Sequence, residues 1–69
     1  MNLYQYDGKI VRVIDVDGRA FTGTAISFPA DYGFHEYGRD EESIKMGDYQ
    51  LFESDIAKIR RTDYVAAAN

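Results

Sequence analysis

Residues 9–28 read KIVRVIDVDGRAFTGTAISF, and they predict two strands joined by a tight turn. Residues 9–16 are rich in β-branched side chains and form too short a run for a typical helix, so they favour a strand. Asp17 and Gly18 follow, and this dipeptide is typical of a two-residue hairpin turn whose central residues take positive φ. The second strand is expected to run from residue 19 to 28. The stretch therefore predicts an antiparallel hairpin.

The second strand is expected to bend at Gly23. Glycine costs stability inside a strand unless the strand bends or another backbone comes close. A long, sharply bent strand allows a few strands to close into a small barrel. Phe21 and Phe28 are expected to supply bulky core side chains, with Val11 and Val13 as their partners across the hairpin.

Pro29 ends the second strand, and residues 29–40 are expected to form a long loop because Gly33 and Gly38 interrupt them. Loops of this length in small domains are often functional. Turn residues and short apolar runs predict further strands at residues 41–46, 49–53 and 57–61, with a tight turn or a single helical turn at 54–55. A short helix is expected near residues 3–6, ended by Gly8. The predicted fold is therefore all-β, a small five-stranded, strongly bent SH3-like barrel over residues 1–64, followed by a tail at 65–69.

The length of the chain favours oligomerisation. Its 69 residues form one domain, and a chain this short buries only about 60% of the surface that it exposes when unfolded. Disulfides, a metal or oligomerisation usually supply the missing stability. The chain has no cysteine and His35 as its single histidine, which excludes disulfides and a structural zinc site. Oligomerisation is therefore the remaining way for the chain to gain this stability.

Charge and motifs exclude several classes of function. The net charge is −4 and the isoelectric point is about 4.7, so the surface repels phosphate backbones on average. A cytoplasmic protein without membrane association is expected, because no apolar run approaches the ~18 residues of a membrane-spanning helix. His35 lacks an adjacent nucleophile with an orienting acid, and the acids at 40–42 lack the ligand spacing of a calcium loop. We therefore expect no enzyme activity, no metal and no cofactor.

The hairpin resembles the first motif of the Sm-like (LSm) proteins. The shared features are a Val-x-Val pair, an Asp-Gly turn, an apolar residue two before a strand glycine, and a phenylalanine that closes the strand, here at residues 11, 13, 17, 18, 21, 23 and 28. Residues 51–59 fall where the shorter second motif belongs. The resemblance covers roughly residues 3–61 and indicates a divergent bacterial or phage-type member with a Sm-like barrel.

The resemblance implies a homo-oligomeric ring. Sm-like proteins, including bacterial Hfq, pair the fourth strand of one subunit with the fifth strand of the next, which covers two sheet edges at once. The implied interface residues here are Tyr49, Gln50, Leu51, Phe52, Ala57, Lys58, Ile59 and Arg60.

Many members of the family bind single-stranded RNA in the ring pore, through an Asp…Asn pair after the second strand and an Arg-Gly in the second motif. Asp31 matches the Asp, but no Asn follows it, and Glu53-Ser54 occupies the Arg-Gly position. The family's RNA contacts are therefore not retained at these positions.

Two groups of residues are candidates for binding RNA or a protein partner. The first lies in residues 29–40 and consists of Asp31, Tyr32, Phe34, His35 and Tyr37. Its rings can stack on bases or meet a protein partner, and the alternative is that two or three of them fold back over the barrel. The second is Lys58 and Arg60, where a cation either binds phosphate or guards an edge strand against aggregation. Two functions stay open: a Sm-like ring that binds RNA or serves as an assembly platform, and an SH3-like adaptor that binds a protein through residues 32–37.

Overall fold

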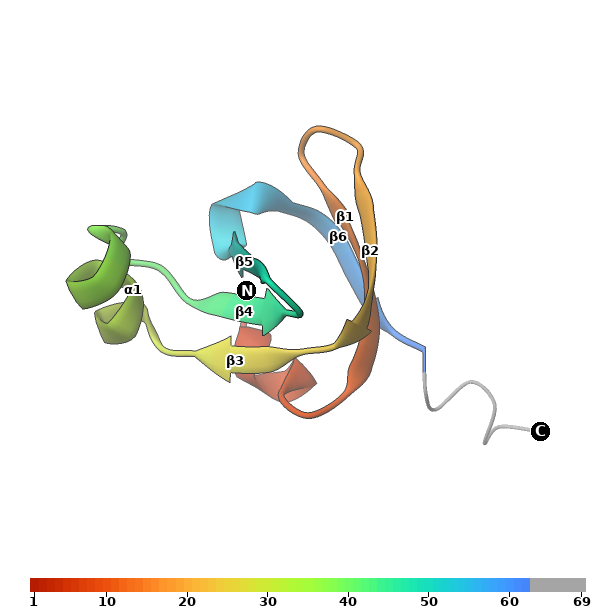
Figure 1. The fold of residues 1–69 in the computed structure, drawn as a ribbon, viewed down its shortest axis with the longest axis horizontal. Coiled ribbons are helices and arrows are strands. Elements are labelled where there is room, and N and C mark those ends of the chain that lie inside the picture. Colours follow the sequence, from red (N-terminus) through yellow and green to blue (C-terminus); the bar gives the residue numbers. More distant parts are fainter. Residues whose placement is uncertain (63–69) are drawn as a thin grey trace.

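The computed structural model of the chain describes residues 1–62. The tail expected at 65–69 lies outside these residues. The elements, shown in Figure 1, are η1 (Leu3–Tyr6), β1 (Ile10–Asp15), β2 (Ala20–Thr24), β3 (Ile26–Phe28), α1 (Ala30–Tyr37), β4 (Ser43–Met46), β5 (Tyr49–Phe52), η2 (Glu53–Asp55) and β6 (Ile56–Arg61). No helix within residues 1–62 is long and apolar enough to cross a membrane.

The strands form two antiparallel sheets of three strands each. Their orders are β2-β1-β6 and β3-β4-β5. Only Ala25 separates β2 from β3, so one bent stretch of chain belongs to both sheets (Figure 1). The prediction of an all-β fold is confirmed as a mostly-β fold that also contains one α-helix within residues 1–62. The five predicted strands are found with ends displaced by one or two residues, and the second of them, residues 19–28, is divided into β2 and β3.

The hairpin turn is longer than expected. Gly18 has a φ of +85°, but no residue other than glycine has positive φ within residues 1–62, so the two-residue turn is wrong. The Asp15 N–H donates to the Arg19 carbonyl at 2.9 Å and the Gly18 N–H donates to the Asp15 carbonyl at 3.0 Å. These bonds close a three-residue loop in which a single left-handed residue, Gly18, returns the chain to the second strand.

The Asp15 carboxylate holds this turn together. Its Oδ1 accepts from the Asp17 N–H at 2.9 Å and the Arg19 N–H at 2.8 Å, and its Oδ2 accepts from the Arg19 Nε at 2.8 Å. The side chain is buried, which disfavours its charge, but the hydrogen bonds from Arg19 and Asp17 outweigh burial and lower the pKa of Asp15. The turn therefore depends on an ionised carboxylate.

The strand breaks at Ala25, whereas the sequence predicted a bend at Gly23. The Ala25 N–H donates to the Lys9 carbonyl at 2.9 Å, and the Gly8 N–H donates to the Ala25 carbonyl at 2.8 Å. The segment that leads from η1 into β1 therefore takes over the hydrogen bonds of the strand at this residue. Gly23 remains inside β2, opposite Val11.

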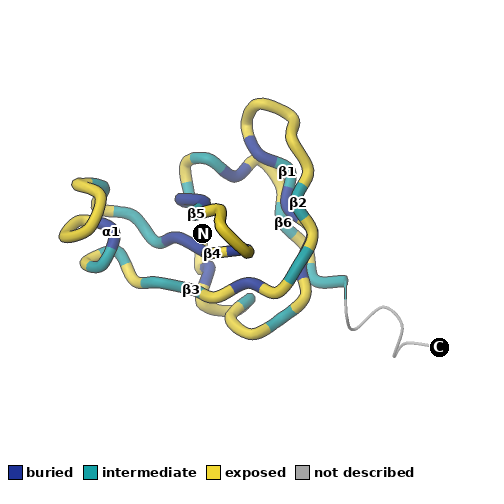
Figure 2. The backbone as a smooth tube through the Cα atoms, in the orientation of Figure 1, coloured by how far each residue is buried: buried dark blue, intermediate teal, exposed yellow. Residues whose placement is uncertain are grey.

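The core lies between the two sheets and is closed by η1. Figure 2 shows that the buried residues fall mainly on the strands, whereas α1 is mostly exposed. Val11 and Val13 are fully buried, as predicted, and Phe21 packs against the core from its margin. Phe28 lies outside this cluster, because its ring contacts α1 instead. The core consists of Leu3, Val11, Val13, Ala25, Ile44, Met46, Leu51 and Ile56.

Residues 30–37 form a helix, so the predicted long loop is wrong. Pro29 precedes the helix, and Gly38 ends it with a φ of +72° while its N–H reaches the carbonyls of Gly33 and Phe34. A Cβ atom on Gly33 would lie 2.6 Å from the carbonyl oxygens of Arg39 and Glu41. Only glycine allows the chain to fold back this closely over the helix.

Candidate functional site

The rings of α1 separate into two groups. Tyr32 stacks on Phe28 with centroids 4.5 Å apart, and Tyr37 meets the ring of Phe52 edge-on at 5.3 Å. Phe34 and His35 contact each other at 5.7 Å and are exposed, as is Asp31. The sequence candidates therefore differ: Tyr32 folds back onto Phe28, Tyr37 contacts Phe52 but is still 51% exposed, and Phe34, His35 and Asp31 are exposed.

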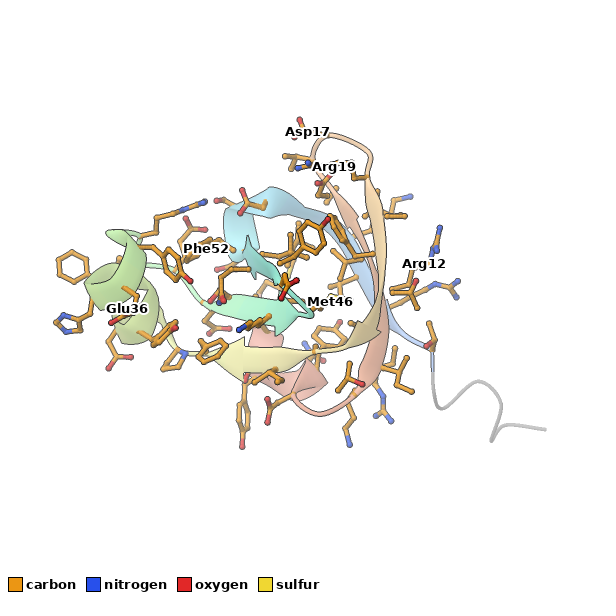
Figure 3. The ribbon with its side chains drawn as sticks, viewed as in Figure 1. Arg12, Asp17, Arg19, Glu36, Met46 and Phe52 are labelled. Atoms are coloured by element: carbon orange, nitrogen blue, oxygen red, sulfur yellow. The ribbon has the colours of Figure 1, made fainter. Side chains whose placement is uncertain are left out.

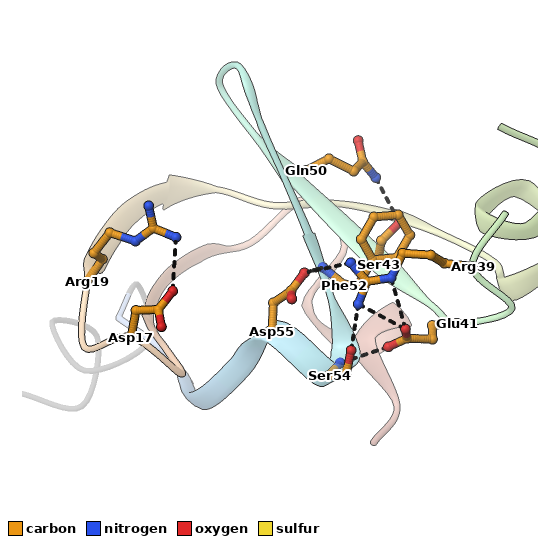
Figure 4. Close-up of polar contacts among 9 residues, drawn as sticks. All are labelled: Asp17, Arg19, Arg39, Glu41, Ser43, Gln50, Phe52, Ser54 and Asp55. Atoms are coloured by element: carbon orange, nitrogen blue, oxygen red, sulfur yellow. Dashed lines mark hydrogen bonds and ion pairs between the residues drawn. The ribbon is translucent and has the colours of Figure 1, made fainter. Parts of the chain in front are cut away.

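Arg39 joins the end of α1 to η2 (Figure 4). Its guanidinium lies 4.2 Å above the centre of the Phe52 ring and 3.0 Å from a Glu41 carboxylate oxygen. It also donates to the Ser54 hydroxyl at 2.6 Å and lies 3.4 Å from Asp55. Arg39 has no distinguishing pattern in the sequence, because Phe52, Ser54 and Asp55 come from another part of the chain.

Glu41 completes this network from the other side. Its Oε1 accepts from the Ser54 N–H at 2.8 Å. Hydrogen bonds from Ser54, and then the charge and hydrogen bonds of Arg39, hold the pKa of Glu41 below its ordinary value. Ser54 and Glu41 are thus fixed in place, and together with Arg39 they tie η2 to the chain after α1.

The predicted interface residues lie on the terminal strands of the two sheets. β5 ends one sheet and β6 ends the other, and neither has a pairing partner on its second side within residues 1–62. On β5, Leu51 and Phe52 are buried, Gln50 is half-buried and Tyr49 is exposed. On β6, Ile59 is half-buried and Ala57, Lys58 and Arg60 are exposed. Each of these two strands therefore has one side open to pairing with a further strand.

Three cations gather on the outer face of β1 and β6. The strand register places Arg12 directly opposite Arg60, and Ile14 opposite Lys58. Arg12 points outward from this sheet in Figure 3. None of the three forms an ion pair with a carboxylate of residues 1–62. We call Arg12, Lys58 and Arg60 the basic strip; like charges directly opposite on neighbouring strands are destabilising.

A groove runs beside the basic strip, along the unpaired edge of β6. Its volume is about 530 Å³, and its lining combines cations with apolar side chains: Met1, Tyr6, Arg12, Ile14, Ala57, Lys58, Ile59 and Arg60. Cations beside free backbone groups suit an extended segment that carries negative charge. Arg12 was missed as a member of this site because strand register cannot be obtained from residue alternation within a single strand.

Within residues 1–62, no group of three or more His, Cys, Asp or Glu side chains lies together in a way that could hold a metal ion. The features that stand out chemically are the two free strand edges and the basic strip. Comparison of the chain with models of protein families, with curated proteins and with solved structures found no match.

Proposed function

We propose that this chain is a self-assembling β-module of the Sm-like type, in which β5 of one copy pairs with β6 of the next copy. The observation that carries the proposal is that β5 and β6, one terminal strand of each sheet, have no strand partner on their second side within residues 1–62. In this proposal β2 and β3 act as one bent strand, and the two sheets are halves of a small five-stranded barrel. Assembly would cover both edges, which are otherwise prone to indiscriminate pairing.

The charges beside the two edges support this pairing. β5 is flanked by Asp48 and Glu53, whereas β6 carries Lys58 and Arg60. Opposite charges along two strands favour their pairing and discourage each strand from pairing with its own kind. A chain of 69 residues also gains stability from burying further surface.

Light scattering after size exclusion tests the proposal. At micromolar concentration we expect a mass that is a multiple of 7.9 kDa. Reversing the β6 charges with Lys58→Glu and Arg60→Glu is expected to dissociate the assembly, and adding Asp48→Lys and Glu53→Lys is expected to restore it. Lys9→Glu with Lys45→Glu is the matched control. A monomer of the unmodified chain under these conditions would contradict the proposal.

A second function, binding of single-stranded RNA, is favoured by the basic strip. The chain carries a net charge of −4, yet three of its cations share one sheet face without carboxylate partners within residues 1–62. Phosphate groups would relieve the repulsion between Arg12 and Arg60. The contact surface would then be the outer sheet face and not the loop positions used by the family.

Fluorescence anisotropy with short U-rich and A-rich oligonucleotides at low salt tests this second function. Arg12→Gln is expected to weaken binding by roughly three- to tenfold and to reduce the salt dependence, since it removes one phosphate contact. Lys45→Gln, which removes an exposed cation on β4, away from the basic strip, is the control. Binding no tighter than millimolar would exclude RNA while leaving self-assembly untouched.

A further inference from the structure

A pocket of about 360 Å³ lies between η1 and the end of β3, and no residue of β5 or β6 lines it. Its walls are two aromatic rings, a proline and two carboxylates, contributed by Tyr4, Asp7, Ser27, Phe28, Pro29 and Glu42. The proposed function uses none of these residues. The geometry points to a binding site for an arginine side chain of a partner polypeptide.

The two carboxylates are held in place, and each has one oxygen to spare. Asp7 Oδ1 accepts from the Ser27 N–H at 2.8 Å, and Glu42 Oε1 accepts from the Leu3 N–H at 2.7 Å. The second oxygen of each has no hydrogen-bond partner within residues 1–62. Two fixed acceptors are preorganised for the parallel donors of a guanidinium.

No cation of the described chain neutralises these carboxylates. Asp15 pairs with Arg19, and Glu41 pairs with Arg39. The amino group of Met1 pairs with Glu53, whose hydrogen bond and charge are the main causes that raise the pKa of that amino group, and the charge of Glu42 adds to them. Asp7 and Glu42 form no ion pair within residues 1–62. The pocket is therefore negatively charged and attracts a cation from outside the chain.

The rings favour arginine over a simple metal ion. Phe28 is held by its stack on Tyr32, 4.5 Å between centroids, so its position does not depend on a ligand. Tyr4 is 72% exposed and lines the pocket. Aromatic faces attract a guanidinium and stack on its plane, while the alkyl stem packs against Pro29. The volume fits one long side chain rather than a folded ligand.

Capped tripeptides with a central arginine, lysine or citrulline test this inference by nuclear magnetic resonance titration. The amides of Leu3 and Ser27 report directly, because they donate to the two carboxylates. We expect the arginine peptide to bind in the low millimolar range, the lysine peptide less tightly, and the neutral citrulline peptide not at all. Asp7→Asn with Glu42→Gln keeps both acceptor oxygens and removes both charges, and it should weaken arginine binding by at least about tenfold.

Asp17→Asn with Asp40→Asn changes the net charge equally outside the pocket and should bind like the unmodified chain. Tyr4→Leu removes an exposed ring without touching the core and should weaken binding severalfold. Equal binding of the citrulline peptide, retention of binding in the double amide variant, or an equal loss in the control variant would overturn the inference. These outcomes are independent of whether the chain assembles.

Discussion

Two rows of side chains on the outer faces of the sheets differ in what covers them. In the first sheet, Thr22, Arg12 and Arg60 lie side by side on three strands and are exposed. In the second sheet, Phe28, Ser43 and Phe52 lie side by side on three strands and are covered by the rings of α1.

The difference shows that α1, the one α-helix within residues 1–62, covers the second sheet and leaves the first sheet open. α1 gives the second sheet a second apolar layer, and Ser43 is fully buried there with its hydroxyl accepting from Gln50 Nε2 at 2.7 Å. The first sheet keeps an open face that carries unpaired cations at a cost in stability. Exposed, electrostatically unfavourable residues are where binding is expected, whereas the covered row is structural.

Gly33→Ala is expected to remove the cover from the second sheet. Its Cβ would lie 2.6 Å from two backbone carbonyl oxygens and 3.2 Å from the Phe52 ring, and backbone cannot move aside cheaply. We expect a loss of about 3 kcal/mol in the free energy of unfolding, measured by urea titration. Gly23→Ala, whose Cβ would meet only Met46 at 4.0 Å, should cost less than about 1 kcal/mol. Similar losses for both would show that α1 does not pack as described.

Replacing single aromatic residues of α1 by serine tests which rings stabilise the fold and which are merely exposed. Tyr32→Ser should cost about 2 kcal/mol, because it removes the stack on Phe28. Phe34→Ser should change stability by no more than about 0.5 kcal/mol, because Phe34 is 57% exposed. If Phe34→Ser abolishes capture of a partner protein while the fold is retained, the adaptor function gains support. The reverse order of stabilities would contradict the division of the rings.

Lowering the pH should destabilise the hairpin of the first sheet, because Asp15 becomes protonated. The pKa of Asp15 in the folded chain lies below its ordinary value of 3.8, so its contribution to stability is present above pH 3.8 and is lost as the pH falls through the folded pKa. Asp15→Asn should therefore be less stable at pH 7, and its difference from the unmodified chain should close as the pH falls below about 3.8. Unfolding measured from pH 7 to pH 2.5 checks this, and a constant difference would refute it.

The smallest expected change in the free energy of unfolding is a gain in stability, whereas the changes above are losses. Arg12→Gln should stabilise the chain by about 0.5 kcal/mol, because it removes the like-charge pair with Arg60. Arg19→Gln should destabilise it, because Arg19 holds the Asp15 carboxylate at 2.8 Å. Thermal unfolding at low salt compares the two variants. A loss of stability in Arg12→Gln would show that the basic strip is structural.

The hairpin and most strands could be predicted because their signals are local. Alternating apolar residues and turn glycines act within a few positions of the chain. α1 could not, because its aromatic residues and internal glycine are poor helix formers and its stability comes from ring contacts with Phe28 and Phe52. Pro29 before the helix and Gly38 after it were the one local signal available.

The candidate site was predicted only in part, for a related reason. Lys58 and Arg60 could be placed on one strand face from alternation, but Arg12 joins them only through the pairing of β1 with β6, 48 positions apart by the register Arg12↔Arg60. The pocket with Asp7 and Glu42 likewise brings together η1 and the start of β4. Such groupings depend on tertiary pairing, which residue patterns within one segment do not contain.

The single residue between β2 and β3 has a geometric consequence. Because Ala25 is the only break between the two sheets, and its backbone is tied to Gly8 and Lys9, the angle between the sheets is set by a short and well-anchored corner. If copies join edge to edge, that angle becomes the rotation from each copy to the next, and the rotation decides whether the assembly closes and with how many members. A one-residue insertion beside Ala25 would then change the symmetry of the assembly without altering either joining edge.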